Sequence, residues 1–330
     1  MKKSILTTAV LASTLAFSAV AQAAVLKISH IRPQGATIDL ELKELSADIE
    51  KSTGGDVKLK IFAANSLGDY TTVQERVSLG AIDMAVQPAA TAASRKMQIS
   101  AFPYIAADWK QAKEIYGPGG AINEAMKELY AKQDIVMLSA YPVYFGGVAL
   151  NREAVAPGNP DVGKGIKVRV PGIKSFQLTA DALGYISSPI PFSEAFTAIQ
   201  TGVVDGVIGS GAEGYFASFR DVTKTYIPIN THFEVWYMLI NAETFADLDS
   251  DDQVALRKAA ADFEVRRWVK AEADQALNEK KLEEYGAKVI EISDEQLAAA
   301  AKKAREVVWP QILNDVGAEW GQGILDKIVK

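Results

Sequence analysis

The chain has 330 residues, with 35 Lys and Arg against 41 Asp and Glu, and a formal net charge of −6 at pH 7. This acidic balance argues against nucleic acid or anionic lipid as a partner. The chain has no cysteine, which excludes disulfides, thiolate metal sites and cysteine nucleophiles. Its only two histidines, His30 and His232, predict neither a metal cluster nor a general base. We therefore expect no cofactor, no metal and no catalytic residue.

The N-terminus has the three parts of a secretory signal peptide. Basic Met1-Lys2-Lys3 precedes an apolar, small-residue run over 5–20, and Ala21-Gln22-Ala23 offers an A-x-A cleavage site. We predict a signal peptide over residues 1–23, cleaved near Ala23, and a periplasmic mature protein. A membrane anchor is the alternative, but the run is short and rich in Ser, Thr and Ala.

The first part of the mature chain alternates strands and helices. Strands are predicted at 25–29, 58–62 and 81–86, where apolar residues alternate or cluster. Helices between them run over about 37–51 and up to Gly80. This order is typical of a parallel sheet covered by helices.

A second unit repeats the pattern. Residues 166–170 alternate apolar and basic side chains and predict a strand. A helix with Ser193 as its predicted N-cap ends at Gly202, and a strand follows over 203–208. Both units contain a helix end, a Gly stop and an acid three residues later, which is a weak internal repeat over 77–83 and 199–205. This repeat is expected if the protein has two similar α/β lobes. The alternative is that any helix-Gly-strand unit looks like this by chance.

Two segments are predicted to cross between the lobes, at about 139–152 and 232–241, and to act as hinges. Ser250 to Gln253 reads as a capping box that begins an unbroken helix to about Tyr285. At 1.5 Å per residue this helix is on the order of 50 Å long, enough to lie along both lobes. A further helix is predicted to be capped at Ser293 and closed by Pro310.

Three motifs together resemble the signature of TRAP-transporter (DctP-type) periplasmic solute-binding proteins: 167–172 (KVRVPG), 191–194 (PFSE) and 198–206 (AIQTGVVDG). The likeness extends from Val25 into the C-terminal helices. It implies an α/β, bilobal periplasmic binding protein fold, with two α/β lobes around a ligand cleft and a long helix spanning both. It also implies a receptor, not an enzyme, that delivers a small organic anion to the small and large TRAP integral membrane subunits. A receptor of an ABC-type or signalling system with the same architecture is the alternative.

The expected lobes follow from the crossing segments. Lobe 1 comprises 24–147 plus about 237–270, and lobe 2 comprises 148–236 plus about 271–330.

Arg169 is the leading candidate for the ligand site. It lies at a strand end beside Pro171-Gly172, where a fixed guanidinium can meet a planar anion with two hydrogen bonds. Spacing alone also fits a surface strand with solvated cations. The resemblance implies that Arg169 binds the ligand carboxylate, or a sulfonate.

The sequence departs from the family after Asp205-Gly206. Many TRAP receptors continue there with Gln-Glu-Asn-Pro, whose Asn contacts the ligand, but this chain has Val-Ile-Gly-Ser over 207–210. We expect Ser210 or backbone amides to serve instead. Glu213 either accepts a hydrogen bond from the ligand or caps the next helix. Family members also often have an Arg in the crossing strand, where this chain has Phe145-Gly146-Gly147, so a second strong anion on the ligand is disfavoured.

The remaining candidates are aromatic residues and strand-end polar residues. Phe192 matches a family position that packs on the ligand, while core packing is equally compatible with the aromatic residues of the crossing segments. The full set of candidate ligand-binding residues is Arg169, Phe192, Gly209, Ser210, Glu213, Tyr144, Trp236, Gln87 and Arg32.

One enzyme hypothesis competes with the receptor. Gly209 to Gly214 matches G-x-G-x-x-G between a predicted strand and a predicted helix, and Glu234 follows about twenty residues later, as in dinucleotide-binding enzymes. The motif comes late in the chain, however, and an exported protein meets little NAD. The glycines are also compatible with a backbone that approaches an anion in the cleft.

Overall fold

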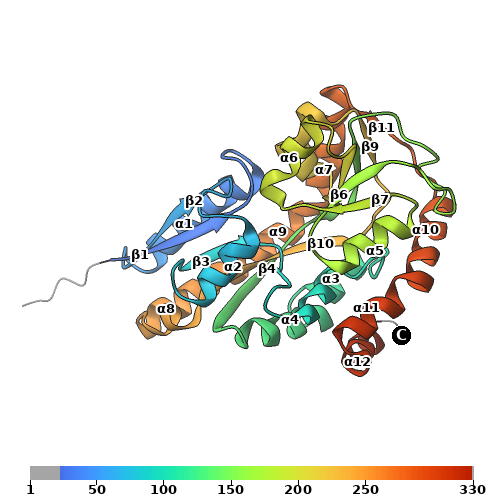
Figure 1. The fold of residues 1–330 in the computed structure, drawn as a ribbon. Helices are drawn as coiled ribbons and strands as arrows, with labels where there is room; N and C mark the ends of the chain where they lie inside the picture. The colour runs from blue at the N-terminus through green and yellow to red at the C-terminus, as the bar shows by residue number, and fades with distance from the viewer. Residues whose placement is uncertain (1–22, 329–330) are drawn as a thin grey trace, which may run out of the picture.

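The computed structural model describes residues 23–328, so the predicted leader lies outside the described residues except for Ala23. Within 23–328, no helix is long and apolar enough to cross a membrane. The described chain forms two α/β lobes, each built on its own sheet (Figure 1).

The first sheet has five strands in the order β2-β1-β3-β10-β4. Its β1, β2 and β3 pair in parallel, while β10 runs antiparallel to both β3 and β4. The strands are β1 (Ala24–His30), β2 (Val57–Phe62), β3 (Met84–Gln87), β4 (Ile135–Phe145) and β10 (Phe233–Asn241).

The second sheet has six strands in the order β11-β9-β5-β8-β6-β7. Parallel β6, β7 and β8 adjoin β5, which runs antiparallel to β8 and β9. The strands are β5 (Gly147–Leu150), β6 (Lys167–Val170), β7 (Ile186–Pro189), β8 (Gly206–Ser210), β9 (Thr225–Ile227) and β11 (Lys288–Val289).

Helices connect and cover these sheets. In the first lobe they are α1 (Thr37–Ser52), α2 (Tyr70–Ser78), the 3₁₀ helix η1 (Arg95–Ala101), α3 (Trp109–Tyr116), α4 (Ala121–Ala131) and α8 (Ala242–Ala246). In the second they are α5 (Lys174–Ala182), α6 (Phe192–Gln200), α7 (Ala212–Phe219) and η2 (Arg220–Val222). The C-terminal part forms α9 (Ser250–Glu284), α10 (Asp294–Val307), α11 (Trp309–Val316) and α12 (Ala318–Ile328).

The internal repeat is confirmed at the level of single hydrogen bonds. Asp83 Oδ2 accepts from the backbone N–H of Lys27 at 2.7 Å, and Asp205 Oδ2 accepts from that of Lys167 at 3.0 Å. Each acid thus bonds the neighbouring parallel strand one residue before the ladder between the two strands begins, at Ile28–Met84 and at Val168–Gly206. The preceding Gly80 and Gly202 have φ of +72° and +75°, a left-handed conformation that favours glycine.

The chain passes from one sheet to the other at two adjacent points. The first crossing is at Gly146, between β4 and β5, and the second is the segment 228–232, between β9 and β10. Gly146 N donates to the carbonyl of His232 at 2.8 Å, and Thr231 N donates to that of Gly146 at 2.8 Å. Since β10 pairs with β4 from Phe233 onward, the second crossing ends before residue 237, where we predicted that the chain returns to lobe 1. The division of the chain into lobes by residue number stays a prediction.

Helix α9 lies along both lobes, as predicted (Figure 1). Its Glu264 and Gln275 accept hydrogen bonds from the backbone N–H groups of Ala140 (2.9 Å) and Phe145 (2.8 Å). Its Arg267 Nε donates to the carbonyl of Pro142 at 2.8 Å. Because β4 is an edge strand, these side chains satisfy backbone groups that have no strand partner.

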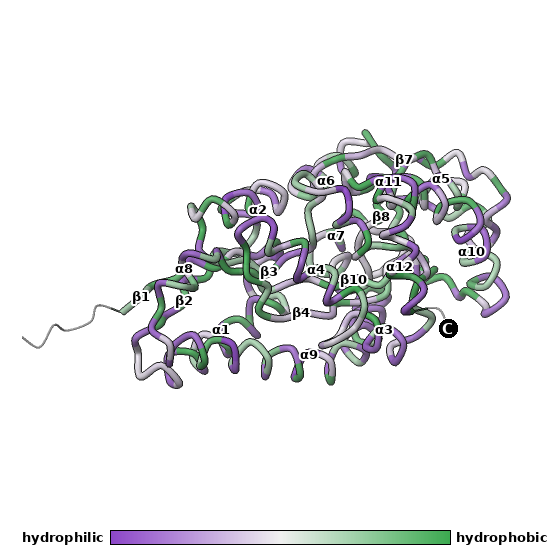
Figure 2. Tube along the Cα trace, turned by 90° about the horizontal axis from the view of Figure 1, so that it is seen from below, coloured by the Kyte–Doolittle hydropathy of each residue, from purple (hydrophilic) through white to green (hydrophobic). Residues whose placement is uncertain are grey.

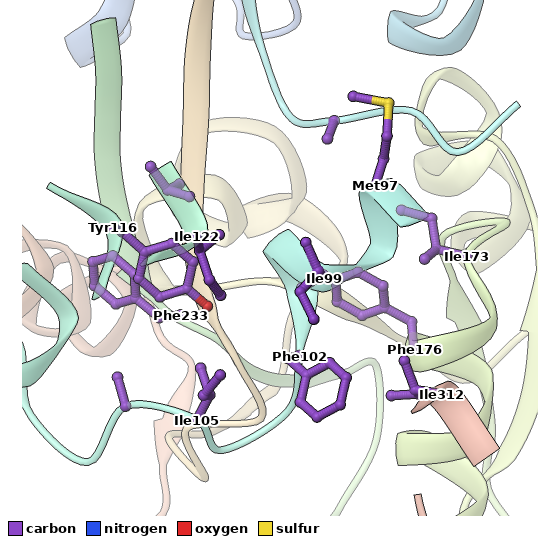
Figure 3. Packing of buried hydrophobic residues seen from close by; sticks show 14 of the residues in the cluster. Met97, Ile99, Phe102, Ile105, Tyr116, Ile122, Ile173, Phe176, Phe233 and Ile312 are labelled. Carbon is purple, nitrogen blue, oxygen red and sulfur yellow. The ribbon is translucent and has the colours of Figure 1, made fainter. Parts of the chain in front are cut away.

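The hydrophobic interior joins elements of both lobes. Figure 3 shows Ile99 of η1 grouped with Ile173 and Phe176 at the start of α5, while Ile312 of α11 lies close by. Two other clusters lie under β1 and α1, and under α6 and α7. The long helix α9 contributes to all three, and its sequence alternates between hydrophilic and hydrophobic residues (Figure 2).

Several predicted element ends were wrong. Helix α6 begins at Phe192 with Pro191 as its N-cap, so Ser193 lies inside its first turn. Helix α9 has Asp249 as its N-cap without a side-chain bond, and Gln253 instead donates to the carbonyl of Leu248 at 2.9 Å. The capping box at Ser293 is confirmed, while Pro310 lies in the first turn of α11, a position that tolerates proline.

Candidate ligand-binding cavity

A small, partly enclosed cavity of about 30 Å³ lies between the two sheets. Its walls come from the ends of β1, β3, β4, β6 and β8, from the start of β10, and from helices α2, η1, α5 and α6. Most of the lining is apolar or aromatic, with three charged residues, and this is the usual composition of a small-molecule site. The lining residues are Ile31, Arg32, Tyr70, Pro88, Ala89, Ser100, Ala101, Tyr144, Arg169, Pro171, Ile173, Phe176, Phe192, Gly209, Glu234, Val235 and Trp236.

Arg169 lines this cavity from β6 and is only 1% exposed. Its Nε donates to the carbonyl of Ile190 at 2.8 Å, which fixes the guanidinium, while its buried Nη1 has no hydrogen-bond partner. None of the ion pairs among residues 23–328 includes Arg169. Burial lowers the pKa of Arg169 below its ordinary value, against smaller opposing effects of Tyr70 and other groups. A buried cation without a counter-charge is costly unless an anion binds it.

Arg32 lines another part of the cavity but already has a partner. Its Nε and Nη2 donate to Glu213 Oε2 at 2.9 and 2.8 Å, and Nη2 lies 3.4 Å from Ser210 Oγ. Although burial lowers it, the charge of Glu213 and these bonds raise the pKa of Arg32 above its ordinary value. Only Nη1 of Arg32 is buried without a partner. Since Arg32 follows β1 and Glu213 begins α7, this ion pair joins the two lobes.

Aromatic rings pack against both guanidinium groups. The Phe192 ring centroid lies 5.4 Å from Cζ of Arg32 and 5.7 Å from Cζ of Arg169, and Trp236 lies 4.9 Å from Arg32. Tyr144 is fully buried, and its hydroxyl lies 3.1 Å from Ser210 Oγ. Burial, the largest cause, raises the pKa of Tyr144 above its ordinary value, so Tyr144 stays a neutral phenol. These rings exclude water around the cations and strengthen any ion pair formed there.

Glu234 is the one acid that lines the cavity. Its Oε2 lies 3.0 Å from His232 Nε2, and its Oε1 accepts from Trp236 Nε1 at 2.8 Å. His232 Nδ1 in turn lies 3.0 Å from the Thr231 hydroxyl. This chain of contacts holds the carboxylate in place at the start of β10. No group of three or more His, Asp or Glu within 23–328 is arranged to hold a metal ion.

The glycine loop after β8 makes room for protein groups. A Cβ on Gly211 would lie 2.5 Å from the Tyr144 ring, and one on Gly214 would lie 2.3 Å from Arg32 Nη2. Gly209 has a φ of +100°, and a Cβ there would lie 2.5 Å from Cδ of the Pro171 ring. The three glycines therefore allow the lobes and strands to pack closely. Glu234, the acid that would bind a ribose in the dinucleotide hypothesis, accepts a hydrogen bond from Trp236 instead. The dinucleotide hypothesis is not supported.

The structure brings most of the predicted ligand residues together. Six of them line the cavity: Arg32, Tyr144, Arg169, Phe192, Gly209 and Trp236. Ser210 and Glu213 do not line the cavity but contact Arg32, which does. The ion pair between Glu213 and Arg32 was not predicted. Gln87 is buried and donates to the carbonyl of Tyr70 at 2.7 Å, away from the lining.

Tyr70, Phe176 and Glu234 also line the cavity but were not among the predicted ligand residues. Tyr70 begins α2 and Phe176 lies in α5, and no sequence pattern distinguishes them from core aromatic residues. Glu234 carried one signal, a lone acid in an otherwise apolar and aromatic strand. A buried acid among such residues usually has a specific role.

Fold and cavity together define a two-lobed α/β solute-binding protein. The model of the bacterial extracellular solute-binding protein family 7 (DctP) matches residues 28–314. A solute-binding protein of Roseobacter denitrificans is 30% identical over 304 residues, covering 90% of this chain and 89% of the relative. The chain belongs to this family, and it is a solute-binding protein of the TRAP type.

Solved structures agree with this fold. The Roseobacter denitrificans TRAP periplasmic solute-binding protein with bound L-galactonate has a TM-score of 0.80 and 24% identity, covering 94% of this chain and 99% of its own. The sugar acid-binding protein DctPAm of Advenella mimigardefordensis in complex with galactonate has a TM-score of 0.85 and 20% identity, covering 93% and 98%. A Sulfurospirillum deleyianum TRAP protein with bound succinate has a TM-score of 0.83 and 20% identity, covering 93% and 99%.

Proposed function

We propose that this protein is the periplasmic receptor of a TRAP transporter, which binds a small organic anion in the interlobe cavity and delivers it to the membrane subunits of the transporter. The ligand carboxylate, or a sulfonate, pairs with Arg169, and the aromatic rings surround the rest of the ligand. Relatives with bound galactonate and succinate support an organic acid as the ligand class. We expect the leader to be removed near Ala23.

The unpaired state of Arg169 carries this proposal. Two other buried arginines near the lobe boundary have acidic partners, Arg32 with Glu213 and Arg267 with Asp274. Arg169 is as deeply buried, but it has no acidic partner among the described residues, and its Nη1 at the cavity is free to meet an anion. An anion from outside the chain supplies the missing counter-charge and one or two charge-assisted hydrogen bonds.

The cavity favours binding over catalysis. Its acid, Glu234, is held by His232 and Trp236, and none of the lining residues forms a nucleophile and base pair. We therefore expect the bound acid to leave unchanged.

Thermal unfolding of the mature chain against a panel of carboxylates, sulfonates and NAD tests the proposal. A ligand at 100 times its Kd adds about 2.7 kcal/mol to the free energy of unfolding, which gives a clear rise in Tm. We expect a rise with at least one organic acid, and Arg169→Ala to weaken binding of that acid by roughly 2–5 kcal/mol in calorimetry. Arg152→Ala is the matched control, because Arg152 is an exposed arginine paired with Asp205 in the same lobe.

Two results would contradict the proposal. One is a response to NAD alone, and the other is an unchanged affinity of the acid for Arg169→Ala. Delivery is tested separately: proteoliposomes that contain the cognate TRAP membrane subunits should take up the acid only when the receptor is added.

A further inference from the structure

The charges around the cavity limit the charge of the ligand. Three charged residues line it: Arg32, Arg169 and Glu234. The charge of Arg32 is balanced by Glu213, which accepts hydrogen bonds from its Nε and Nη2. Glu213 does not itself line the cavity. The cavity is left with one unpaired cation, Arg169, and one carboxylate, Glu234. This leaves no second free cation for a second anionic group.

Glu234 retains capacity to accept hydrogen bonds. A carboxylate offers about four lone-pair sites, and His232 and Trp236 occupy two of them. The residue lies at the cavity wall with 7% of its surface exposed. Arg169, Glu234 and Tyr70 all line this cavity. Burial chiefly raises the pKa of Tyr70, while Arg169 lowers it and both Asp69 and Glu234 raise it.

We propose, on the basis of the receptor function above, that the ligand is a monocarboxylate with an O–H or N–H donor that reaches Glu234, and that the cavity selects against dicarboxylates. The carboxylate binds Arg169 and the donor binds Glu234, so the two ends of the ligand meet opposite charges. The apolar walls formed by Ile173, Phe176 and Val235 contact the carbon skeleton between them. A dicarboxylate places its second charge against Glu234, or against an Arg32 whose charge is already balanced, and like charges in a dry cavity repel strongly.

Matched acids test this selection in the intact mature protein. Three skeletons provide the probes: propanoate, butanoate and 3-phenylpropanoate, each as the plain acid, the hydroxy acid, the amino acid and the dicarboxylate. Calorimetry on each gives the ratio of dicarboxylate to donor-bearing monocarboxylate affinity. We expect that ratio to be about 0.1 or lower for the wild type on the skeleton that binds best. The hydroxy and amino arms identify which donor Glu234 prefers.

Two variants change the charges without removing the side chains. Glu234→Gln removes the negative charge at the cavity wall. Glu213→Gln removes the negative charge that balances Arg32, so that Arg32 becomes a second uncompensated cation at the cavity. Each should raise the dicarboxylate ratio by roughly 10- to 100-fold, and only Glu234→Gln should also weaken the hydroxy or amino acid relative to the plain acid. Glu194→Gln is the control, because Glu194 is exposed on α6 and does not line the cavity.

The ratio separates selection from a general loss of structure. If both Gln variants weaken every probe by the same factor, the two acids are structural and the inference is overturned. If a dicarboxylate binds the wild type as tightly as the matched monocarboxylates, and Arg169→Ala abolishes that binding, the inference fails while the receptor function stands. If no acid binds the folded wild type, the receptor function fails, and the inference fails with it.

Discussion

Arg32 and Glu213 lie 181 positions apart in the chain, yet they form a buried ion pair with Nη2 and Oε2 at 2.8 Å. One residue follows the first strand of the first lobe and the other begins α7 of the second lobe. Opening of the lobes at this point separates the two charges. In the arrangement seen here, the pair therefore joins the two lobes.

We expect Arg32→Ala to shift the unliganded protein toward an open arrangement. Glu213 would be left buried without a partner in the closed form, which costs roughly 3–5 kcal/mol, whereas opening hydrates it. Small-angle scattering should show a larger radius of gyration and calorimetry a weaker ligand affinity. Arg266→Ala is the control, since the Arg266–Asp48 pair is exposed and worth at most about 1 kcal/mol. Identical scattering of the Arg32 variant and the wild type would contradict this role.

Gly146→Ala should destabilise the protein strongly. A Cβ at this position would lie 2.2 Å from Cε1 of His232 and 2.8 Å from the Thr231 hydroxyl, and the neighbouring strands leave little room to move. We expect a loss of roughly 1–3 kcal/mol or more, as for overpacked sites, seen as a lower midpoint of urea unfolding. Gly163→Ala has open space and no positive φ, so the same measurement should show almost no change there. Equal effects of the two variants would refute this steric explanation.

Glu264 should tolerate Gln but not Ala. Burial is the largest effect on its pKa and raises it above the ordinary value, so the folded state favours the neutral acid. This stabilising effect of protonation is fully present below the ordinary pKa and is lost as the pH rises through the raised pKa. At pH 7, Glu264→Gln removes a buried charge and keeps an acceptor for Ala140 N, but it loses the second acceptor for Trp268 Nε1 at 3.2 Å, so the net change should be within about 1 kcal/mol. Glu264→Ala leaves that N–H unpaired and should cost about 1–3 kcal/mol in urea unfolding.

The free energy of unfolding should decrease in mild acid because of His30. The His30 ring is buried, with Nε2 3.4 Å from Asp39 Oδ1 and an unpartnered Nδ1, and burial lowers its pKa below the ordinary value of 6.5 despite Asp39. Below that value the unfolded chain takes up a proton that the folded chain does not, so stability decreases as the pH falls. Urea unfolding at pH 7.5, 6.5 and 5.5 should show a shallower decrease for His30→Gln. Parallel curves for the variant and the wild type would exclude His30 as a cause.

Much of the fold could be predicted because its signals are local. The Gly stops and the acids at 83 and 205 predicted the repeat, and the uninterrupted polar and apolar pattern predicted α9 to within a residue or two. The N-caps at Ser193 and Ser250 failed because a neighbouring Pro191 or Asp249 occupies the cap position. A cap depends on backbone dihedral angles that residue type alone does not determine.

The site could be predicted where a motif, a crossing segment or a strand end marks it. Arg169 and Phe192 belong to motifs and do line the cavity. The pairing of Arg32 with Glu213 depends on how the two lobes meet, and no local pattern contains that information. Glu234 was noticed only as part of a dinucleotide hypothesis that the glycine contacts do not support. Long-range contacts, rather than residue types, decide such roles.

The two crossings are hydrogen-bonded to each other at Gly146, and α9 is bonded to β4 one residue before it, at Phe145. Bending one crossing alone would break the hydrogen bonds that join it to the other, so we expect the two crossings to bend together. We expect the lobes to move as two rigid bodies about a single axis through this pair. Fluorophores placed on the two lobes would then report two discrete distances, exchanging between open and closed, rather than a continuous spread.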